Sequence, residues 1–163
     1  MRRVVLTATA ILALSAPAAA APPSAGVLVP SESLGGLRLG ATNAQVERAW
    51  GRAYGICTNC PRETWYFNSF AFEPDGVGVE FRKGRASAVF TLHSPPGWRT
   101  RQGLELGAGV AEVRGTYGAL TRFDCRGYYA LVLERARSRT AFYILRERLW
   151  AFGLSRTNVP VCR

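Results

Sequence analysis

Four cysteines are the residues of this 163-residue chain most able to carry covalent chemistry. Cys57 and Cys60 form a C-x-x-C motif, whereas Cys125 and Cys162 stand far apart in the sequence. An even number of cysteines in an exported chain favours a disulfide framework, and four cysteines allow three connectivities. We predict the pairs Cys57–Cys60 and Cys125–Cys162, because the first pair lies in what reads as an inserted loop.

Two other kinds of cysteine chemistry fit less well. A redox-active C-x-x-C motif normally lies at a helix N-terminus after a strand, but here it follows a predicted helix and precedes a predicted strand. A four-cysteine zinc site needs two closely spaced pairs, which Cys125 and Cys162 do not supply. A thiol-disulfide enzyme built on Cys57 and Cys60 stays as an alternative, and we expect no metal and no other cofactor.

The remaining residues with catalytic potential are few. His93 is the sole histidine and adjoins a double-proline loop, with no nucleophile-elbow motif in the chain. Asp75 and Asp124 are the sole aspartates, and a turn explains Asp75. The glycines form no phosphate-cradling pattern. The sequence therefore predicts a non-enzymatic protein that has no nucleic acid among its partners.

The N-terminus has the pattern of an export signal. Arg2 and Arg3 precede a largely apolar run over 4–16, and residues 18–20 are alanines of the kind found at cleavage sites. The run is shorter than the about 20 residues that a membrane span needs. We expect a signal peptide over 1–20, no membrane span and a protein that is secreted or extracytoplasmic.

The chain is strongly basic, with 21 Lys and Arg against 11 Asp and Glu and a formal net charge of +10. All the basic residues except Lys83 are arginines, which a GC-rich genome can produce without selection for binding. Such a charge also attracts anionic cell-wall polymers, lipid head groups or an acidic partner. An electrostatic binder of anionic envelope polymers is therefore a second alternative.

One segment of the chain occurs twice. Residues 36–51 (GLRLGATNAQVERAWG) and 103–118 (GLELGAGVAEVRGTYG) agree at eight of sixteen positions. This self-similarity indicates a duplicated structural unit. We expect a flexible lead over 21–30, followed by a single domain over 31–163 whose two repeats span 31–94 and 100–163.

Each copy predicts a short helix followed by antiparallel strands. Thr42 and Gln45 have the form of a capping box, which predicts that the first helix begins at Asn43. Gly109 replaces the threonine in the second copy, so the second helix should be less firmly capped. β-branched and aromatic residues, with a Lys83-Gly84 hairpin signal, predict the main strands. These are Thr64–Phe72, Val77–Arg82, Arg85–Leu92, Tyr128–Leu133, Thr140–Leu145 and Arg148–Leu154.

A second alignment, at an offset of 62 residues, assigns the faces of these strands. Strand alternation gives a core set of Val77, Val79, Phe81, Ala86, Ala88, Phe90 and Leu92 in the first copy, and of Tyr143, Trp150, Phe152 and Leu154 in the second. The opposite side of the second copy then carries Phe142, Ile144 and Leu149. Exposed apolar groups usually mark an interface, so these three residues are the predicted binding face, with Glu80 and Arg82 as its charged rim.

The repeated segment resembles the tandem-repeat β-lactamase inhibitor protein family, and a single copy resembles the SmpA/OmlA-type outer-membrane-assembly lipoproteins. The matching residues are Gly36, Gly40, Ala41, Thr42, Val46 and Gly51, and again Gly103, Gly107, Ala108, Val113 and Gly118. The resemblance implies an α+β fold in which two helix-plus-strands units form one continuous sheet with short helices on one face. No inhibitory residue matches this chain, so β-lactamase is not carried over as a target.

These observations together predict an exported, monomeric, non-enzymatic protein-binding module of an inhibitor-like or envelope-associated kind. Its expected partner is an extracellular or envelope protein that the sequence does not identify.

Overall fold

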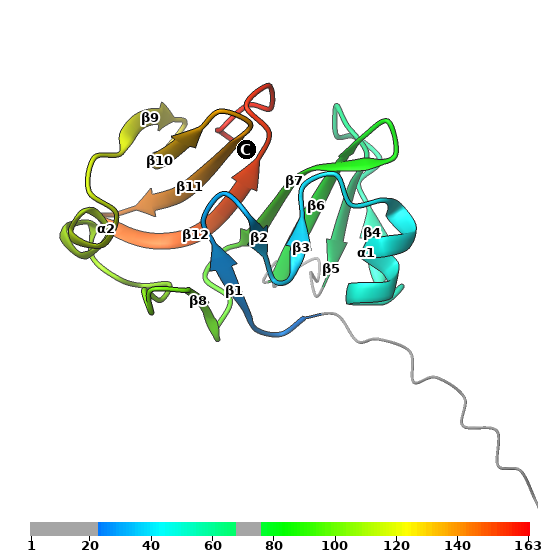
Figure 1. Cartoon of the computed structure of the whole chain (residues 1–163), viewed down its shortest axis with the longest axis horizontal. Helices are drawn as coiled ribbons and strands as arrows, with labels where there is room; N and C mark the ends of the chain where they lie inside the picture. The colour runs from blue at the N-terminus through cyan, green and yellow to red at the C-terminus, as the bar shows by residue number, and fades with distance from the viewer. Residues whose placement is uncertain (1–22, 68–75) are drawn as a thin grey trace, which may run out of the picture.

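The computed structural model describes residues 23–67 and 76–163, which form two β-sheets and two short helices (Figure 1). The predicted signal peptide lies outside the described residues. The larger sheet has eight antiparallel strands in the order β4-β5-β6-β7-β12-β11-β10-β9. They are β4 (Tyr54–Ile56), β5 (Thr64–Phe67), β6 (Gly76–Arg82), β7 (Arg85–Leu92), β9 (Thr121–Cys125), β10 (Tyr128–Arg135), β11 (Ser138–Leu145) and β12 (Arg148–Ser155).

Strands from the two halves of the chain meet in the middle of the larger sheet. β7 pairs with β12 through Ser155 opposite Ala88 and Gly153 opposite Phe90. The predicted Lys83-Gly84 turn joins β6 to β7, and both of its residues have the positive φ that a two-residue hairpin requires. The internal repeat itself stays a prediction from the sequence.

The smaller sheet consists of very short strands in the order β3-β2-β1-β8. They are β1 (Gly26–Val29), β2 (Ser33–Leu34), β3 (Leu37–Arg38) and β8 (Trp98–Thr100), and β1 and β8 are parallel. β2 lies against β12 and β3 against β7, so this sheet covers the junction of the two halves (Figure 1). Residues 26–29, which lie in the segment expected as a lead, form strand β1.

Two eight-residue helices complete the described structure, α1 (Asn43–Trp50) and α2 (Val110–Tyr117). α1 begins where the sequence predicts, because the Gln45 amide donates to Thr42 Oγ1 (3.3 Å) and the Thr42 amide donates to Gln45 Oε1 (2.8 Å). α2 follows Gly109, which supplies no side-chain cap.

The predicted fold class is wrong. The described residues are mostly β, in two separate sheets, instead of an α+β repeat that forms one sheet with helices on one face. The smaller sheet escapes sequence reasoning because strands of two to four residues are too short to show a period of two.

The main core lies between the two sheets. The smaller sheet contributes Leu28, Leu34 and Trp98, and the helices contribute Trp50 and Val113. The Trp50 indole N–H also donates to the Gly35 carbonyl at 2.9 Å, which ties α1 to the loop between β2 and β3. The other side of the larger sheet, which we call the outer face, carries two smaller apolar clusters.

Two β-bulges interrupt the alternation of side chains along the larger sheet. The β6–β7 register shifts after Glu80 and leaves Ser87 without a partner in the ladder. The β11–β12 register shifts after Tyr143 and likewise leaves Trp150 without a partner in the ladder. A bulge adds one residue to one strand, so the side chains beyond it point to the opposite face.

The predicted binding face is wrong. Phe142, Ile144 and Leu149 are each 0 % exposed and belong to the main core. Ser87 and Trp150 are 63 residues apart, one more than the offset of 62 used to compare the strands. A slip of one residue moves every side chain to the other face.

Part of the predicted core set is misplaced as well, by this slip in the second half and by the Ser87 bulge in the first. Tyr143 packs in one cluster of the outer face, with Trp150 against it, while Ala88, Phe90 and Leu92 belong to the other cluster.

Candidate functional site

A pocket of about 430 Å³ on the outer face is the best candidate for a functional site. Six aromatic side chains line it, and we call it the aromatic pocket: Tyr66, Phe90, His93, Tyr128, Tyr143 and Trp150. Its polar lining includes Arg62, Glu80 and Arg163. The pocket therefore draws on strands from both halves of the larger sheet and on the last residues of the chain.

Two glycines allow aromatic rings to lie flat on the outer face. A Cβ atom at Gly78 in β6 would lie 2.5 Å from Cζ of Phe90, and one at Gly153 in β12 would lie 2.9 Å from the Tyr143 hydroxyl oxygen. Any larger residue at these positions would push the rings off the strands. Phe90 then meets Tyr66 edge to face, with ring centroids 6.3 Å apart.

The segment after β12, residues 156–163, crosses the outer face between its two clusters. Val159 packs with Ala88 and Phe90, and Val161 packs with the cluster around Tyr143. The Tyr143 hydroxyl also donates to the Val161 carbonyl at 2.8 Å. This segment forms part of the pocket wall because it contributes Pro160, Cys162 and Arg163 to the lining.

Both predicted disulfides are confirmed. Cys57 pairs with Cys60 and Cys125 with Cys162, at Cα–Cα separations of 5.6 and 5.5 Å. Cys60 and Cys162 line the aromatic pocket, so each bond fixes a different part of its wall.

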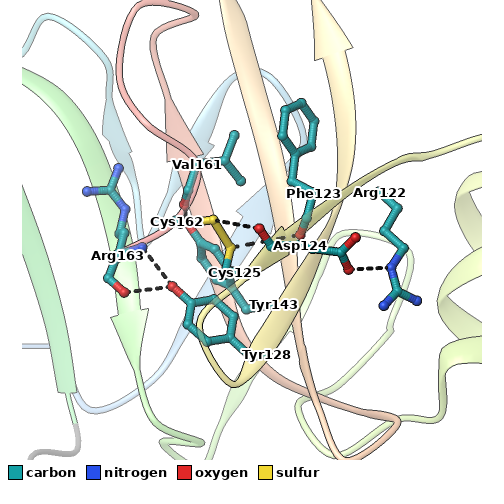
Figure 2. Close-up of a disulfide and its surroundings, with 9 residues drawn as sticks. All are labelled: Arg122, Phe123, Asp124, Cys125, Tyr128, Tyr143, Val161, Cys162 and Arg163. Carbon is teal, nitrogen blue, oxygen red and sulfur yellow. Dashed lines mark hydrogen bonds and ion pairs between the residues drawn. A yellow bond between two sulfur atoms is a disulfide. The ribbon is translucent and has the colours of Figure 1, made fainter.

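Tyr128 is locked to the main chain beside the second disulfide (Figure 2). Its hydroxyl donates to the Arg163 carbonyl oxygen at 2.6 Å and accepts from the Arg163 amide at 2.7 Å. The ring is edge to face with Trp150, with centroids 5.7 Å apart. Tyr128 therefore presents a ring of fixed orientation to the pocket.

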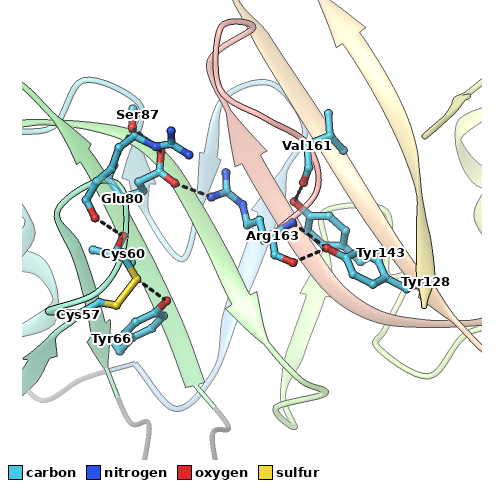
Figure 3. Close-up of polar contacts among 11 residues, drawn as sticks. Cys57, Cys60, Tyr66, Glu80, Ser87, Tyr128, Tyr143, Val161 and Arg163 are labelled. Carbon is cyan, nitrogen blue, oxygen red and sulfur yellow. Dashed lines mark hydrogen bonds and ion pairs between the residues drawn. A yellow bond between two sulfur atoms is a disulfide. The ribbon is translucent and has the colours of Figure 1, made fainter. Parts of the chain in front are cut away.

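Glu80 is the buried charge of the pocket, with 5 % exposure (Figure 3). Its carboxylate accepts from Arg62 Nε and, at 2.9 Å, from Arg163 Nη1, while the Ser87 hydroxyl lies 3.3 Å from Oε1. The Arg163 guanidinium also lies 4.6 Å from the Phe90 ring centroid, a cation–π distance. Two guanidinium groups against one carboxylate leave this part of the pocket with an excess of positive charge.

Burial raises the pKa of the Tyr143 hydroxyl, an effect that nearby Arg163 opposes. Burial likewise raises the pKa of Tyr66, again opposed by Arg163. Both side chains are consequently neutral hydrogen-bond donors at physiological pH.

The structure brings together few of the residues that the sequence selected. Glu80, predicted as an exposed rim, is in the pocket but buried between two arginines. Arg82 is exposed at the β6–β7 hairpin and does not line the pocket, and Phe142, Ile144 and Leu149 lie on the opposite face. The aromatic lining was missed, although the predicted Cys125–Cys162 bond already brings Tyr128 and Arg163 close together.

The described residues contain no cluster of metal ligands and no membrane-spanning helix. No group of three or more His, Cys, Asp or Glu side chains there could hold a metal ion. No helix in the same residues has the length and apolar character needed to cross a bilayer.

Comparison with known proteins identifies the fold more than the activity. The chain matches no protein-family model and no curated protein sequence. A DUF4309 family protein, YjgB, from Bacillus subtilis subsp. subtilis str. 168 is similar in structure, with a TM-score of 0.53 and 15% identity over 72% of this chain and 79% of that chain.

A second solved structure is an extracellular protein containing a SCP domain from Bacillus anthracis str. Ames. Its TM-score is 0.50 and its identity 9%, over 73% of this chain but only 44% of that chain. The present chain thus corresponds to less than half of that protein. At these identities the likeness shows that the three proteins share a fold.

Proposed function

We propose that this protein is an extracytoplasmic binding module whose aromatic pocket holds an aromatic side chain from an acidic segment of a partner polypeptide. The observation that carries the proposal is a pocket of about 430 Å³ that six aromatic side chains line and two disulfides stabilise. Rings in fixed edge-to-face positions suit another planar ring, and such pairs contribute about 0.5–1.5 kcal/mol beyond the area that they bury.

Charge supports an acidic partner. The pocket contains two guanidinium groups and one carboxylate, and the whole chain carries a formal net charge of +10. Complementary charge speeds association and selects among partners. A polypeptide with carboxylates on either side of its aromatic residue would meet both requirements.

The hydrogen bonding in the pocket favours binding over catalysis. Glu80 is engaged by Arg62 and Arg163, Tyr128 by the main chain of Arg163, and Tyr143 by the carbonyl of Val161. Groups whose hydrogen bonds are satisfied within the protein define a rigid surface, whereas a general acid or base must reach a proton of the substrate.

Two observations support a location outside the cytoplasm. Disulfides persist in oxidising compartments, and the chain has two of them. The structurally similar protein from Bacillus anthracis str. Ames is described as extracellular, which supports the same location. The proposed location covers both a secreted protein and one that stays in the cell envelope. We also propose that the protein is a monomer.

A peptide titration followed by NMR tests the proposed function. The probe is a blocked peptide with one tryptophan flanked by glutamates, and the reporters are the indole N–H signals of Trp150 in the pocket and of Trp50 in the core. We expect the Trp150 signal to shift and the Trp50 signal to stay. The Trp150→Ala variant should bind about tenfold more weakly, and Ile56→Ala, at a 58 % exposed site outside the pocket, should bind as the parent does.

Two results would contradict the proposed function. One is equal affinity for a peptide in which leucine replaces the tryptophan, because the pocket would then not distinguish an aromatic side chain from an aliphatic one. The other is equal affinity for a peptide in which lysines replace the glutamates.

A thiol-disulfide exchange function is the second candidate, because Cys60 borders the pocket and its sulfur lies 3.9 Å from the Tyr66 hydroxyl. It predicts turnover of a peptide disulfide that is lost in the Cys57→Ser/Cys60→Ser variant. The binding proposal predicts that the parent chain, with both disulfides intact, shows no such turnover.

A further inference from the structure

A second hollow, of about 440 Å³, lies at the end of the β6–β7 hairpin, and we propose that it binds a ligand with adjacent phosphoryl groups. Four cationic and two neutral polar side chains line it, and we call it the basic hollow: Arg82, Lys83, Arg85, Ser87, Arg156 and Asn158. None of these residues lines the aromatic pocket, so the two sites are separate.

Backbone geometry brings these cations together from two distant parts of the chain. Arg82 and Arg85 stand directly opposite each other across a turn in which Lys83 and Gly84 have φ values of 52° and 67°. The Arg156 amide donates to the carbonyl of the bulge residue Ser87 at 2.9 Å. The bulge in β7 therefore fixes where the segment after β12 begins, and with it the position of the Arg156 side chain.

The four cations have no carboxylate partner among the described residues. Seven ion pairs occur there, and none involves Arg82, Lys83, Arg85 or Arg156. The polar contact of the Arg85 side chain is with the Gly40 carbonyl, at 3.2 Å from Nη1. No acidic residue lines the basic hollow.

Such an arrangement disfavours the unliganded state. Like charges directly opposite each other on neighbouring strands destabilise a sheet, and here Arg82 faces Arg85. A bound anion would remove this repulsion.

The number and type of the cations indicate phosphoryl groups. A carboxylate carries a single negative charge, whereas a phosphoryl group carries about −1.5 to −2 at neutral pH and presents three acceptor oxygens. Three of the four cations are arginines, whose planar guanidinium groups bind such oxygens in pairs. The hollow, at about 440 Å³, is many times larger than the about 30 Å³ that a water molecule takes in the liquid. It therefore has room for more than one phosphoryl group.

Calorimetric titration of the intact, disulfide-bonded chain with tripolyphosphate tests this proposal, with orthophosphate and citrate as comparison ligands. We expect tripolyphosphate to bind at least about tenfold more tightly than either. The Arg82→Gln/Lys83→Gln variant should lose about tenfold or more in affinity, because two of the four cations are gone. Titration with a glycerol phosphate oligomer then distinguishes a phosphodiester polymer, which would bind, from a free polyphosphate ligand.

The matched control is Arg126→Gln/Arg146→Gln, which removes the same charge from exposed turns at the opposite end of the larger sheet. It should change the affinity by less than about twofold. An equal loss of affinity in the control would show that net charge alone attracts the ligand, and it would overturn the proposed site. Equal affinity for citrate would overturn the assignment of phosphoryl groups as the ligand. If the test variant does not fold, tripolyphosphate must shift the Lys83 and Gly84 NMR signals of the parent chain more than those of Arg146, and the reverse result overturns the proposal.

Discussion

The Arg163 guanidinium donates to the buried carboxylate of Glu80 across 83 residues of sequence, at 2.9 Å. The main chain of Arg163 is held at the same time by the Tyr128 hydroxyl. Glu80 belongs to the first half of the larger sheet and Tyr128 to the second, so one residue links the two halves on the outer face (Figure 3).

Replacing Glu80 with glutamine should lower the free energy of unfolding by about 2 kcal/mol, because Arg62 and Arg163 would lose the charge that offsets their burial. Urea denaturation measures the change. The control is Glu32→Gln, which breaks exposed ion pairs with Arg38 and Arg101 and should cost less than about 0.5 kcal/mol. Equal effects of the two substitutions would show that the Glu80 network adds nothing to stability.

The two disulfides should differ in their contribution to stability. Loop-closure entropy assigns roughly 4 kcal/mol to Cys125–Cys162 and about 2 kcal/mol to Cys57–Cys60, because the first bond closes a loop with a sequence separation of 37 and the second one of 3. Denaturation of the two double serine variants compares them. A larger loss on removing Cys57–Cys60 would contradict the entropic account.

Phe142→Ala should lower the free energy of unfolding by about 3–5 kcal/mol, since the ring is fully buried and packs against Tyr117 with centroids 4.5 Å apart. Leu145→Ala, at an exposed position of the same strand, should change it by less than about 0.5 kcal/mol. Thermal and urea unfolding provide both values. A small effect at Phe142 would restore the exposed face that the sequence suggested.

Arg146→Asn should stabilise the protein by about 0.5 kcal/mol, because Arg146 has a φ of 51° and asparagine tolerates the left-handed conformation better. Arg126→Asn removes the same charge at a turn residue without positive φ and should give no gain. Denaturant midpoints of the two variants distinguish backbone conformation from charge. Equal gains would attribute the effect to the lost charge.

Alkaline pH should destabilise the fold through Tyr143. Burial raises its pKa in the folded state, so the stabilisation is fully present below the ordinary pKa of 10.0 and is lost as the pH rises through the folded-state value. The free energy of unfolding should fall by about 1.4 kcal/mol per pH unit in that interval.

Urea denaturation at about pH 9 and about pH 11 measures this slope. Tyr143→Phe cannot ionise, so its stability should fall less steeply despite the lost hydrogen bond to Val161. An identical slope in the variant would assign the effect to other groups.

Local signals in the sequence predicted local structure well. The capping box placed the start of α1, Lys83-Gly84 placed the β6–β7 turn, and the cysteines were paired correctly. Each of these features depends on residues near one another in sequence, or on a chemistry with few solutions. The strand ranges β6, β7 and β12 also agree with prediction within one residue.

Such local signals predicted neither the faces of the strands nor the smaller sheet. The residue types around Ser87 and Trp150 do not predict a bulge, yet each bulge changes the face to which the following side chains point. The strands of the smaller sheet are defined by their tertiary partners more than by their own residues, as the parallel pairing of Leu28 with Thr100 shows. The aromatic pocket lies on the outer face, where the side chains depend on both bulges, and therefore could not be assembled from the sequence.

The two edges of the larger sheet bear on how the protein behaves at high concentration. β4 has three residues, and the disulfide-closed turn of Cys57 and Cys60 follows it directly. The other edge, β9, presents the exposed charges of Arg122 and Asp124. Short or charged edges offer little backbone for a strand of another molecule to join, so this β-rich chain resists edge-to-edge growth into fibrils.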